Sequence, residues 1–294
     1  MVTQAVVDSL VESGCEAISW QEWVTQTEVD TITAAARVAL AKARTQRVAA
    51  VLLDQYRGVL RASIDQCVAL LETEHFESAT TQLNELQRFS ELGEHLVQPW
   101  QVVVAGPPNV GKSSLINVIL GYERSIVFEQ PGTTRDVLRA TTALDGWPVE
   151  LRDTAGLREN QDPVETQGIE LAREQIASAD LVVLVFDASC PWSRDEVRLC
   201  EQTESVARRM IVVHNKVDIA QRLPPNKIDL LTSAKSGEGI DGLIAAITNS
   251  LIPTPPLPGT AIPFTREQRL AVEQALTLAT DGKAEESVAA LKRV

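Results

Sequence analysis

Histidine and cysteine are scarce in this sequence of 294 residues, with three and four copies, respectively. The cysteines share no metal-ligand spacing, so we expect reduced thiols and no zinc site. The histidines stand isolated from one another, which favours packing roles. No apolar run approaches the roughly 20 residues of a membrane helix, and the amino-terminus lacks the basic and apolar stretches of a secretory signal. These absences predict a cytoplasmic protein with no membrane partner.

An excess of basic residues is also missing. The chain has 27 Lys and Arg against 40 Asp and Glu, for a formal net charge of −13. General nucleic-acid binders neutralise phosphates with a basic face. The charge therefore disfavours sequence-independent binding to nucleic acid, although a local basic patch is compatible with it.

No proline occurs before Pro99, and residues 1–98 contain only three glycines. Apolar positions such as Val48, Val51 and Leu52 recur at the spacing of an amphipathic helix. The pattern predicts an all-helical part, with helices near 28–73 (broken at most once) and 76–97 and a shorter helix before them.

Residues 99–253 have a different sequence pattern, in which short β-branched runs alternate with amphipathic stretches. This alternation is typical of βαβ units and a mostly parallel sheet, so the predicted fold class is α/β. Residues 137–144 and 147–152, joined by Asp145-Gly146, predict instead a hairpin with one antiparallel edge strand. Helices are expected near 112–120, 165–178, 194–207 and 239–251.

The proline-rich segment 253–259 predicts a stiff linker, because proline cannot continue a helix. After it, residues 265–280 are again amphipathic, and we expect this helix to pack on the amino-terminal helices. The predicted organisation is an α/β domain at 99–253 inserted into an all-α domain formed by 1–98 and 254–294.

The segment Gly106–Ser113, with sequence GPPNVGKS, fits the phosphate-loop pattern GxxxxGK[ST] between a strand and a helix. Its backbone N–H groups and the helix dipole favour phosphates, Lys112 adds a charge to the β/γ oxygens, and Ser113 can ligate Mg²⁺. A plain glycine turn before a helix is the alternative. The expected nucleotide contacts here are Asn109, Val110, Gly111, Lys112, Ser113 and Ser114.

Two further segments fit the magnesium and γ-phosphate part of such a site. Asp153 ends a predicted strand and is expected to hold Mg²⁺, and Gly156 is expected to meet the γ-phosphate. Between them and the phosphate loop, Thr134 is the candidate that completes the magnesium shell only when the γ-phosphate is present. A turn-forming aspartate and an ordinary polar loop are the alternatives.

Guanine is the predicted base. Asn215-Lys216-Val217-Asp218 follows a strand, and the Asp218 carboxylate can accept two hydrogen bonds from the guanine edge, which adenine cannot offer. Ser233, Ala234 and Lys235 follow the next strand and are expected to close over the base. The sequence therefore predicts a GTP/GDP-binding domain of the Ras-like P-loop class.

The group that activates water is less clear from the residues. Ras-like proteins place a glutamine directly after the Asp-x-x-Gly motif, but this sequence has Leu157 there. Either hydrolysis is slow or another polar group orients water, and several acids between 158 and 170 qualify.

Taken together, these motifs resemble the MnmE (TrmE) family of tRNA-modification GTPases, which act on the wobble uridine. A weaker likeness extends from about Gly14 to the helix after Thr265, and that family also inserts its G domain into a helical domain. The matching segments are Gly106–Asn117, Gly132–Val137, Asp153–Glu159, Val164–Glu165 and Gly168–Glu170.

The resemblance implies how hydrolysis proceeds. It assigns the orientation of water to Glu165, beside the catalytic contributions of Lys112, Thr134 and Gly156. It also implies a K⁺ ion held by Asn109 and by switch backbone near Phe128, and dimerisation of G domains across their nucleotide faces. Neutralising charge between the β- and γ-phosphates is a physically sensible use of such a cation.

Two features of that family have no counterpart here: an amino-terminal folate-binding domain and a terminal Cys-x-Gly-Lys motif. The leading expectation is a potassium-assisted GTPase that drives a partner through its helical domain. One alternative is a GTP-dependent scaffold that does not hydrolyse the nucleotide. Another is a tRNA-modifying role whose missing parts come from another chain.

Overall fold

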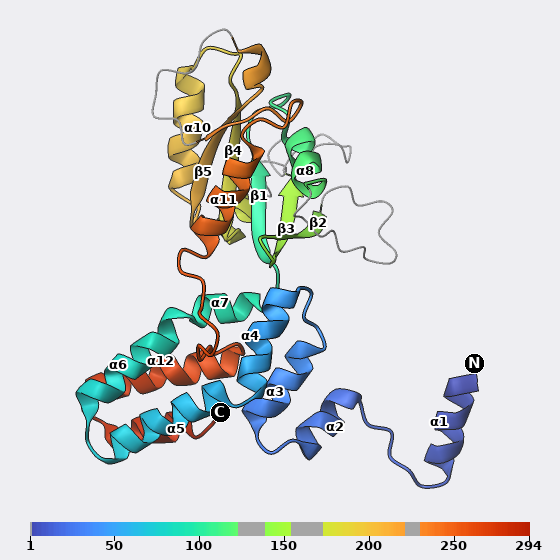
Figure 1. Cartoon of the computed structure of the whole chain (residues 1–294), viewed down its shortest axis with the longest axis vertical. Coiled ribbons are helices and arrows are strands. Elements are labelled where there is room, and N and C mark those ends of the chain that lie inside the picture. The colour runs from blue at the N-terminus through green and yellow to red at the C-terminus, as the bar shows by residue number, and fades with distance from the viewer. Residues whose placement is uncertain (1, 123–138, 154–172, 221–229) are drawn as a thin grey trace. The chain divides into compact units, whose positions relative to one another are not determined.

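The computed structural model describes residues 2–122, 139–153, 173–220 and 230–294. It divides the chain into two compact units. The helical unit comprises residues 1–43, 49–97 and 257–294, and the sheet unit comprises residues 44–48 and 98–256 (Figure 1). Each unit has its own buried core.

The amino-terminal part is helical, as its composition predicts, but its long helix is interrupted. The expectation of at most one break in 28–73 is wrong, because three separate helices occupy this range. Asp30 starts one of them by accepting hydrogen bonds from the N–H groups of Ile32 and Thr33. Gly58, with a left-handed φ of 94°, separates the next two. The helices are α1 (Val2–Glu12), α2 (Trp20–Thr27), α3 (Thr31–Leu40), α4 (Gln46–Tyr56), α5 (Val59–Glu72), α6 (Phe76–Arg88) and α7 (Ser90–His95).

Two helices at the carboxyl end complete the helical unit. Helix α12 (Arg266–Thr280) packs on α6, and α13 (Ala284–Leu291) packs on α5 and α12. The sequence pattern did not predict α13. It begins after Gly282, whose φ of 74° ends the preceding helix. Ser287 then joins the two helices by donating a hydrogen bond to the carbonyl of Ala275.

The segment 257–264, which leads from the sheet unit to α12, is hydrogen-bonded to α4. The backbone N–H of Gly259 donates to Asp54 at 2.8 Å. The buried Gln55 amide donates to the carbonyl of Thr260 at 3.0 Å and accepts from the N–H of Ile262 at 3.2 Å. A buried amide with both ends paired holds this segment in one register.

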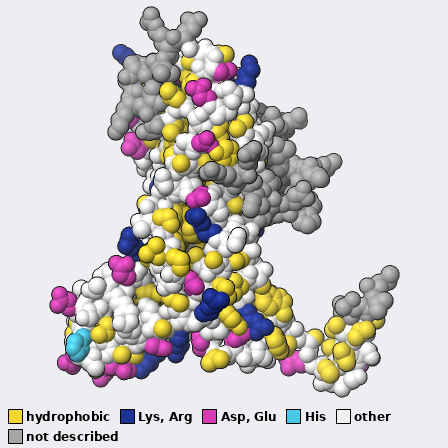
Figure 2. Space-filling view, in the orientation of Figure 1, with side chains coloured by type: hydrophobic (Ala, Val, Ile, Leu, Met, Phe, Trp, Pro, Cys, Tyr) yellow, Lys and Arg dark blue, Asp and Glu magenta, His cyan; other side chains and the backbone are white. Residues whose placement is uncertain are grey.

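Apolar side chains are exposed on α1, whose surface shows hydrophobic atoms in Figure 2. Val6, Val7, Leu10 and Val11 are each more than a third exposed. On the face drawn, basic and acidic side chains are interspersed. None of the helices within the described ranges combines the length and apolarity needed to cross a membrane.

The sheet unit contains a six-stranded sheet with strand order β2-β3-β1-β4-β5-β6. All neighbouring strands are parallel except β2 and β3, which confirms the α/β class with one antiparallel edge strand. Asp145 and Gly146 connect this hairpin, and both have positive φ, as a two-residue hairpin turn requires. The strands are β1 (Trp100–Ala105), β2 (Arg139–Leu144), β3 (Trp147–Asp153), β4 (Leu181–Asp187), β5 (Met210–Asn215) and β6 (Leu230–Leu231).

Helices cover both faces of this sheet (Figure 1). Helices α8 (Lys112–Leu120) and α11 (Ile240–Leu251) lie against β1, β3 and β4. On the other face, Leu199 of α10 (Arg194–Glu204) packs on a cluster that includes Val103, Leu184 and Phe186. Because β1 and β4 are covered on both sides, they are apolar except for Gln101 and Asp187, as parallel central strands are. Helix α10 ends three residues before its predicted end at 207.

The thiols differ sharply in accessibility. Cys67 is buried on α5, and burial raises the pKa of its thiol to about 12, whereas Cys15 and Cys190 are exposed. Because the thiolate is the reactive form, we expect Cys67 of the native protein to stay unmodified by a disulfide reagent at pH 8 while Cys15 and Cys190 react. Peptide mass mapping measures this. Labelling in urea is the control, and rapid native labelling of Cys67 would contradict its burial.

Candidate nucleotide-binding site

The loop between β1 and α8 depends on two glycines. A Cβ on Gly106, whose φ is 142°, would lie 2.1 Å from the carbonyl oxygen of Val185 in β4. A Cβ on Gly111, whose φ is 93°, would lie 2.5 Å from Nδ2 of Asn215. These distances are far shorter than real contacts, so both positions require glycine. The loop is thus packed against the ends of β4 and β5 as its backbone turns into α8.

Lys112 is the first residue of α8 and is only 5% exposed. Its ammonium group donates to the carbonyls of Gly106 at 3.1 Å and Pro107 at 2.8 Å, so its side chain folds back over the loop. Gly111, which precedes α8, offers no side chain to cap the helix. A buried ammonium beside the open amino-terminus of a helix creates an electropositive site suited to phosphate.

Ser113 and Asp153 meet next to this loop. Asp153 ends β3, and its Oδ2 accepts a hydrogen bond from the Ser113 hydroxyl at 2.6 Å. The described residues contain no cluster of three or more His, Cys, Asp or Glu that could enclose a metal. A hydroxyl and one carboxylate nevertheless fit Mg²⁺, which takes oxygen ligands and fills the rest of its shell with water and phosphate oxygens.

Asn215 connects the predicted base-recognition segment to the phosphate loop. It ends β5, is 1% exposed, and donates through Nδ2 to the carbonyl of Val110 at 2.9 Å. Its Oδ1 accepts from the N–H of Ala234 at 3.0 Å. The same oxygen also accepts from the Thr232 hydroxyl at 3.4 Å. The side-chain amide therefore connects three loops of the sheet unit.

Asp218 is positioned by Ser233. The buried hydroxyl of Ser233 donates to Oδ1 of Asp218 at 2.7 Å and accepts from the N–H of Ser236 at 3.1 Å. The carboxylate is exposed and can accept more than this one hydrogen bond. It therefore has the capacity to receive the paired donors of a guanine edge. Lys235, two residues after Ser233, is exposed.

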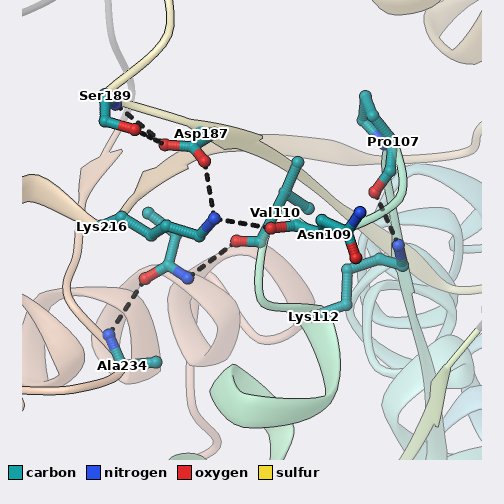
Figure 3. A network of polar contacts seen from close by, with 9 residues as sticks. Pro107, Asn109, Val110, Lys112, Asp187, Ser189, Lys216 and Ala234 are labelled. Atoms are coloured by element: carbon teal, nitrogen blue, oxygen red, sulfur yellow. Dashed lines mark hydrogen bonds and ion pairs between the residues drawn. The ribbon is translucent and has the colours of Figure 1, made fainter.

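Lys216 makes a contact that the sequence did not indicate. Its ammonium lies 2.6 Å from the carbonyl of Asn109 and 2.6 Å from Oδ2 of Asp187, the last residue of β4 (Figure 3). Burial by itself raises the pKa of Asp187. Hydrogen bonds from Lys216 and Ser189 outweigh burial and keep that pKa below its usual range. Asp187 belongs to none of the motifs, so its sequence context does not mark it as a site residue, although it ends a parallel strand at the same sheet edge as Asp153.

The described residues thus bring together Lys112, Ser113, Asp153, Asn215, Lys216, Asp218 and Ser233 at the carboxyl ends of the strands. Ligands of open α/β sheets bind at this edge. The other candidates lie outside the described residues, namely Phe128, Thr134, Gly156, Leu157 and Glu165.

Comparisons with known proteins agree with this geometry. Residues 101–216 match the family model described as 50S ribosome-binding GTPase. The tRNA modification GTPase MnmE of Geotalea uraniireducens (strain Rf4) is 32% identical over 286 residues, which cover 86% of this chain and 62% of that protein. This similarity extends beyond the sheet unit into the helical one. This chain is similar to MnmE GTPases along both of its units.

A second relative shows the same similarity. MnmE of Syntrophotalea carbinolica (strain DSM 2380 / NBRC 103641 / GraBd1) is 41% identical over 166 residues, which cover 55% of this chain and 36% of that protein. The chain thus spans less than two thirds of the length of these relatives. The G domain of the FeoB iron transporter of T. maritima is 25% identical and covers 52% of this chain and 99% of its own, with a TM-score of 0.37. The fold assignment rests on strand order rather than on that score.

Proposed function

We propose that the chain binds GTP with Mg²⁺ and hydrolyses it to GDP and phosphate, assisted by K⁺. The observation that carries this proposal is the junction of the two recognition segments. Asn215 and Lys216 bind the backbone carbonyls of Val110 and Asn109, so the phosphate loop and the guanine-recognition turn form one continuous surface. Such a surface fits a ligand with a guanine at one end and phosphates at the other.

Binding follows from the chemistry of this surface. The Lys112 ammonium exchanges its two loop carbonyls for β- and γ-phosphate oxygens, which are stronger acceptors because they are charged. Ser113 and Asp153, which share a hydrogen bond, would hold Mg²⁺, and the ion would neutralise phosphate charge. Asp218, held by Ser233, accepts from the guanine edge.

The hydrolytic step is assigned through the family. Glu165 orients and activates the attacking water in place of the glutamine of Ras-like proteins, whose position Leu157 occupies. Thr134 and Gly156 act at the γ-phosphate. Asn109, together with backbone near Phe128, would hold K⁺, which would supply positive charge to the phosphates. A cation there stabilises charge that develops as the phosphate bond breaks.

Steady-state hydrolysis of GTP in KCl and NaCl at equal ionic strength tests this mechanism. We expect turnover about tenfold higher in K⁺, because a fixed charge near the breaking bond acts mainly on the transition state. Glu165→Ala is expected to lower turnover about a hundredfold, the contribution of a general base, and to retain GDP binding. Asp162→Ala, a nearby acid without an assigned role, is the matched control. Equal rates in both salts exclude the potassium step.

The relatives' name supports a further part of the proposal, that the GTPase cycle serves tRNA modification in the cytoplasm. A nucleotide-dependent contact between two G domains and a protein partner at the helical unit belong to the same proposal. Deleting the gene and analysing the wobble uridine of tRNA by mass spectrometry tests the role. Fully modified tRNA in the deletion strain excludes it and leaves the GTPase assignment intact.

A further inference from the structure

Beyond the residues of the recognized motifs, we infer that Asp187 is a positioning residue for guanine nucleotides. It holds the ammonium of Lys216 against the carbonyl of Asn109 and thereby joins the base-recognition turn to the phosphate loop. This inference rests on the proposed function, since it concerns the same site. We call the contact from Asp187 through Lys216 to Asn109 the bridge (Figure 3).

The bridge connects two strained pieces of backbone. Asn109 has a φ of 64° and Lys216 a φ of 67°, both in the left-handed region that residues with a side chain adopt uncommonly, asparagine more readily than lysine. One ammonium group contacts both pieces, since it belongs to Lys216 and binds the carbonyl of Asn109. The contact therefore stabilises the conformations of both recognition segments.

The Asp187 carboxylate is oriented for this task. Its Oδ1 accepts from the backbone N–H of Ser189 at 2.9 Å and from the Ser189 hydroxyl at 2.6 Å. That pairing turns Oδ2 toward Lys216, which it meets at 2.6 Å. The Asp187 and Lys216 side chains are 16% and 31% exposed, so the pair is shielded more than an ordinary surface ion pair.

A second contact between β5 and the phosphate loop allows the effect of the bridge on nucleotide binding to be measured without loss of the fold. Asn215 independently binds the carbonyl of Val110, the residue after Asn109. When Asp187 loses its charge, the Asn215 contact still keeps the phosphate loop near β5. Lys216, however, loses the group that fixes its ammonium. We therefore expect weaker nucleotide binding in a protein that remains folded.

A double-mutant cycle on the affinity for GDP tests the inference. Titration calorimetry is performed with the full chain, with Asp187→Asn, with Lys216→Met and with both changes together. We expect Asp187→Asn to raise the Kd for GDP about tenfold, the effect of losing a charge-assisted hydrogen bond. In the Lys216→Met background, the same change is expected to have no further effect, because the two residues act through one contact.

Asp180→Asn is the matched control. Asp180 immediately precedes the same strand, at its opposite end, where it accepts from the N–H of Gln101 and pairs with Arg208. We expect this change to lower the free energy of unfolding without altering the Kd for GDP. Steady-state kinetics add a second readout, since Asp187→Asn is expected to raise KM by a larger factor than it lowers kcat.

The outcomes separate two failures. If the unaltered chain does not bind GDP, the proposed function itself fails. If the unaltered chain binds GDP and Asp187→Asn binds it equally well, only the role of Asp187 is overturned. Additive effects in the double mutant would also overturn it, because they would show that Asp187 and Lys216 act separately.

Discussion

Asp218→Asn is expected to weaken GTP binding on the order of a thousandfold, the cost of losing two charge-assisted hydrogen bonds. The Asp218 carboxylate is anchored by Ser233 and exposed on its remaining side, where it can accept from both donors of guanine. An asparagine amide places an N–H₂ group opposite one of those donors. The resulting pair of opposed donors leaves a polar group unsatisfied in the bound state.

Asp218→Asn is also expected to strengthen the binding of xanthine nucleotides while it weakens the binding of GTP. Xanthine has a carbonyl where guanine has its amino group, so an asparagine can donate to it and accept from N1–H. Binding of GTP and XTP to both proteins, measured by fluorescent-nucleotide displacement, should therefore show opposite changes. Asp241→Asn, an exposed aspartate in the first turn of α11, is the control. Wild-type GTP affinity in Asp218→Asn would remove Asp218 from the base site.

Gly106→Ala is expected to lower the free energy of unfolding of the sheet unit by about 3 kcal/mol or more and to abolish nucleotide binding, because it adds backbone strain to overpacking. Its Cβ would lie 2.1 Å from the carbonyl oxygen of Val185. That atom belongs to β4 in the middle of the sheet, so it cannot move aside. The loop must shift instead, and Lys112 shifts with it.

Gly237→Ala is a control that introduces the backbone strain of a positive φ without a steric clash of the added Cβ. Gly237 has a φ of 82°, but a Cβ there would meet nothing within 4 Å. We expect this control to cost about 1 kcal/mol, the strain of a left-handed residue alone. Urea unfolding followed by circular dichroism gives both stabilities, and calorimetry gives GDP binding. If the two variants are equally stable, the close approach of the loop to β4 does not govern stability.

Much of the sheet unit was predictable because its signals are local. The apolar run of β4 and the turn at Asp145 and Gly146 each specify their own structure within a few residues. The breaks between α3, α4 and α5 were less predictable, because Ala-rich segments keep helical spacing across them. There the Thr45 hydroxyl, which accepts from the N–H of Val48 at the start of α4, and a left-handed Gly58 before α5 outweigh the periodicity.

In the candidate site too, the local features were predictable and the long-range contacts were not. The phosphate loop and the guanine-recognition turn are contiguous motifs, and the structure places them at one sheet edge. The contacts that join them are not contiguous: Asn215 reaches Val110, 105 residues away, and Lys216 reaches Asp187, 29 residues away. No pattern within a single segment reveals such pairs. The order of parallel strands does, since β1, β4 and β5 are neighbours.

The order of elements along the chain has a consequence for synthesis. Helices α5 and α6 precede the sheet unit, whereas α12 and α13, which pack on them, follow it. Residues 98–256 are therefore synthesised before the partners of α5 and α6 exist. At about 5–20 residues per second, this interval lasts roughly 10 to 30 s. In a nascent chain, the sheet unit can fold first. During that time the helical unit is incompletely folded and accessible to chaperones and proteases.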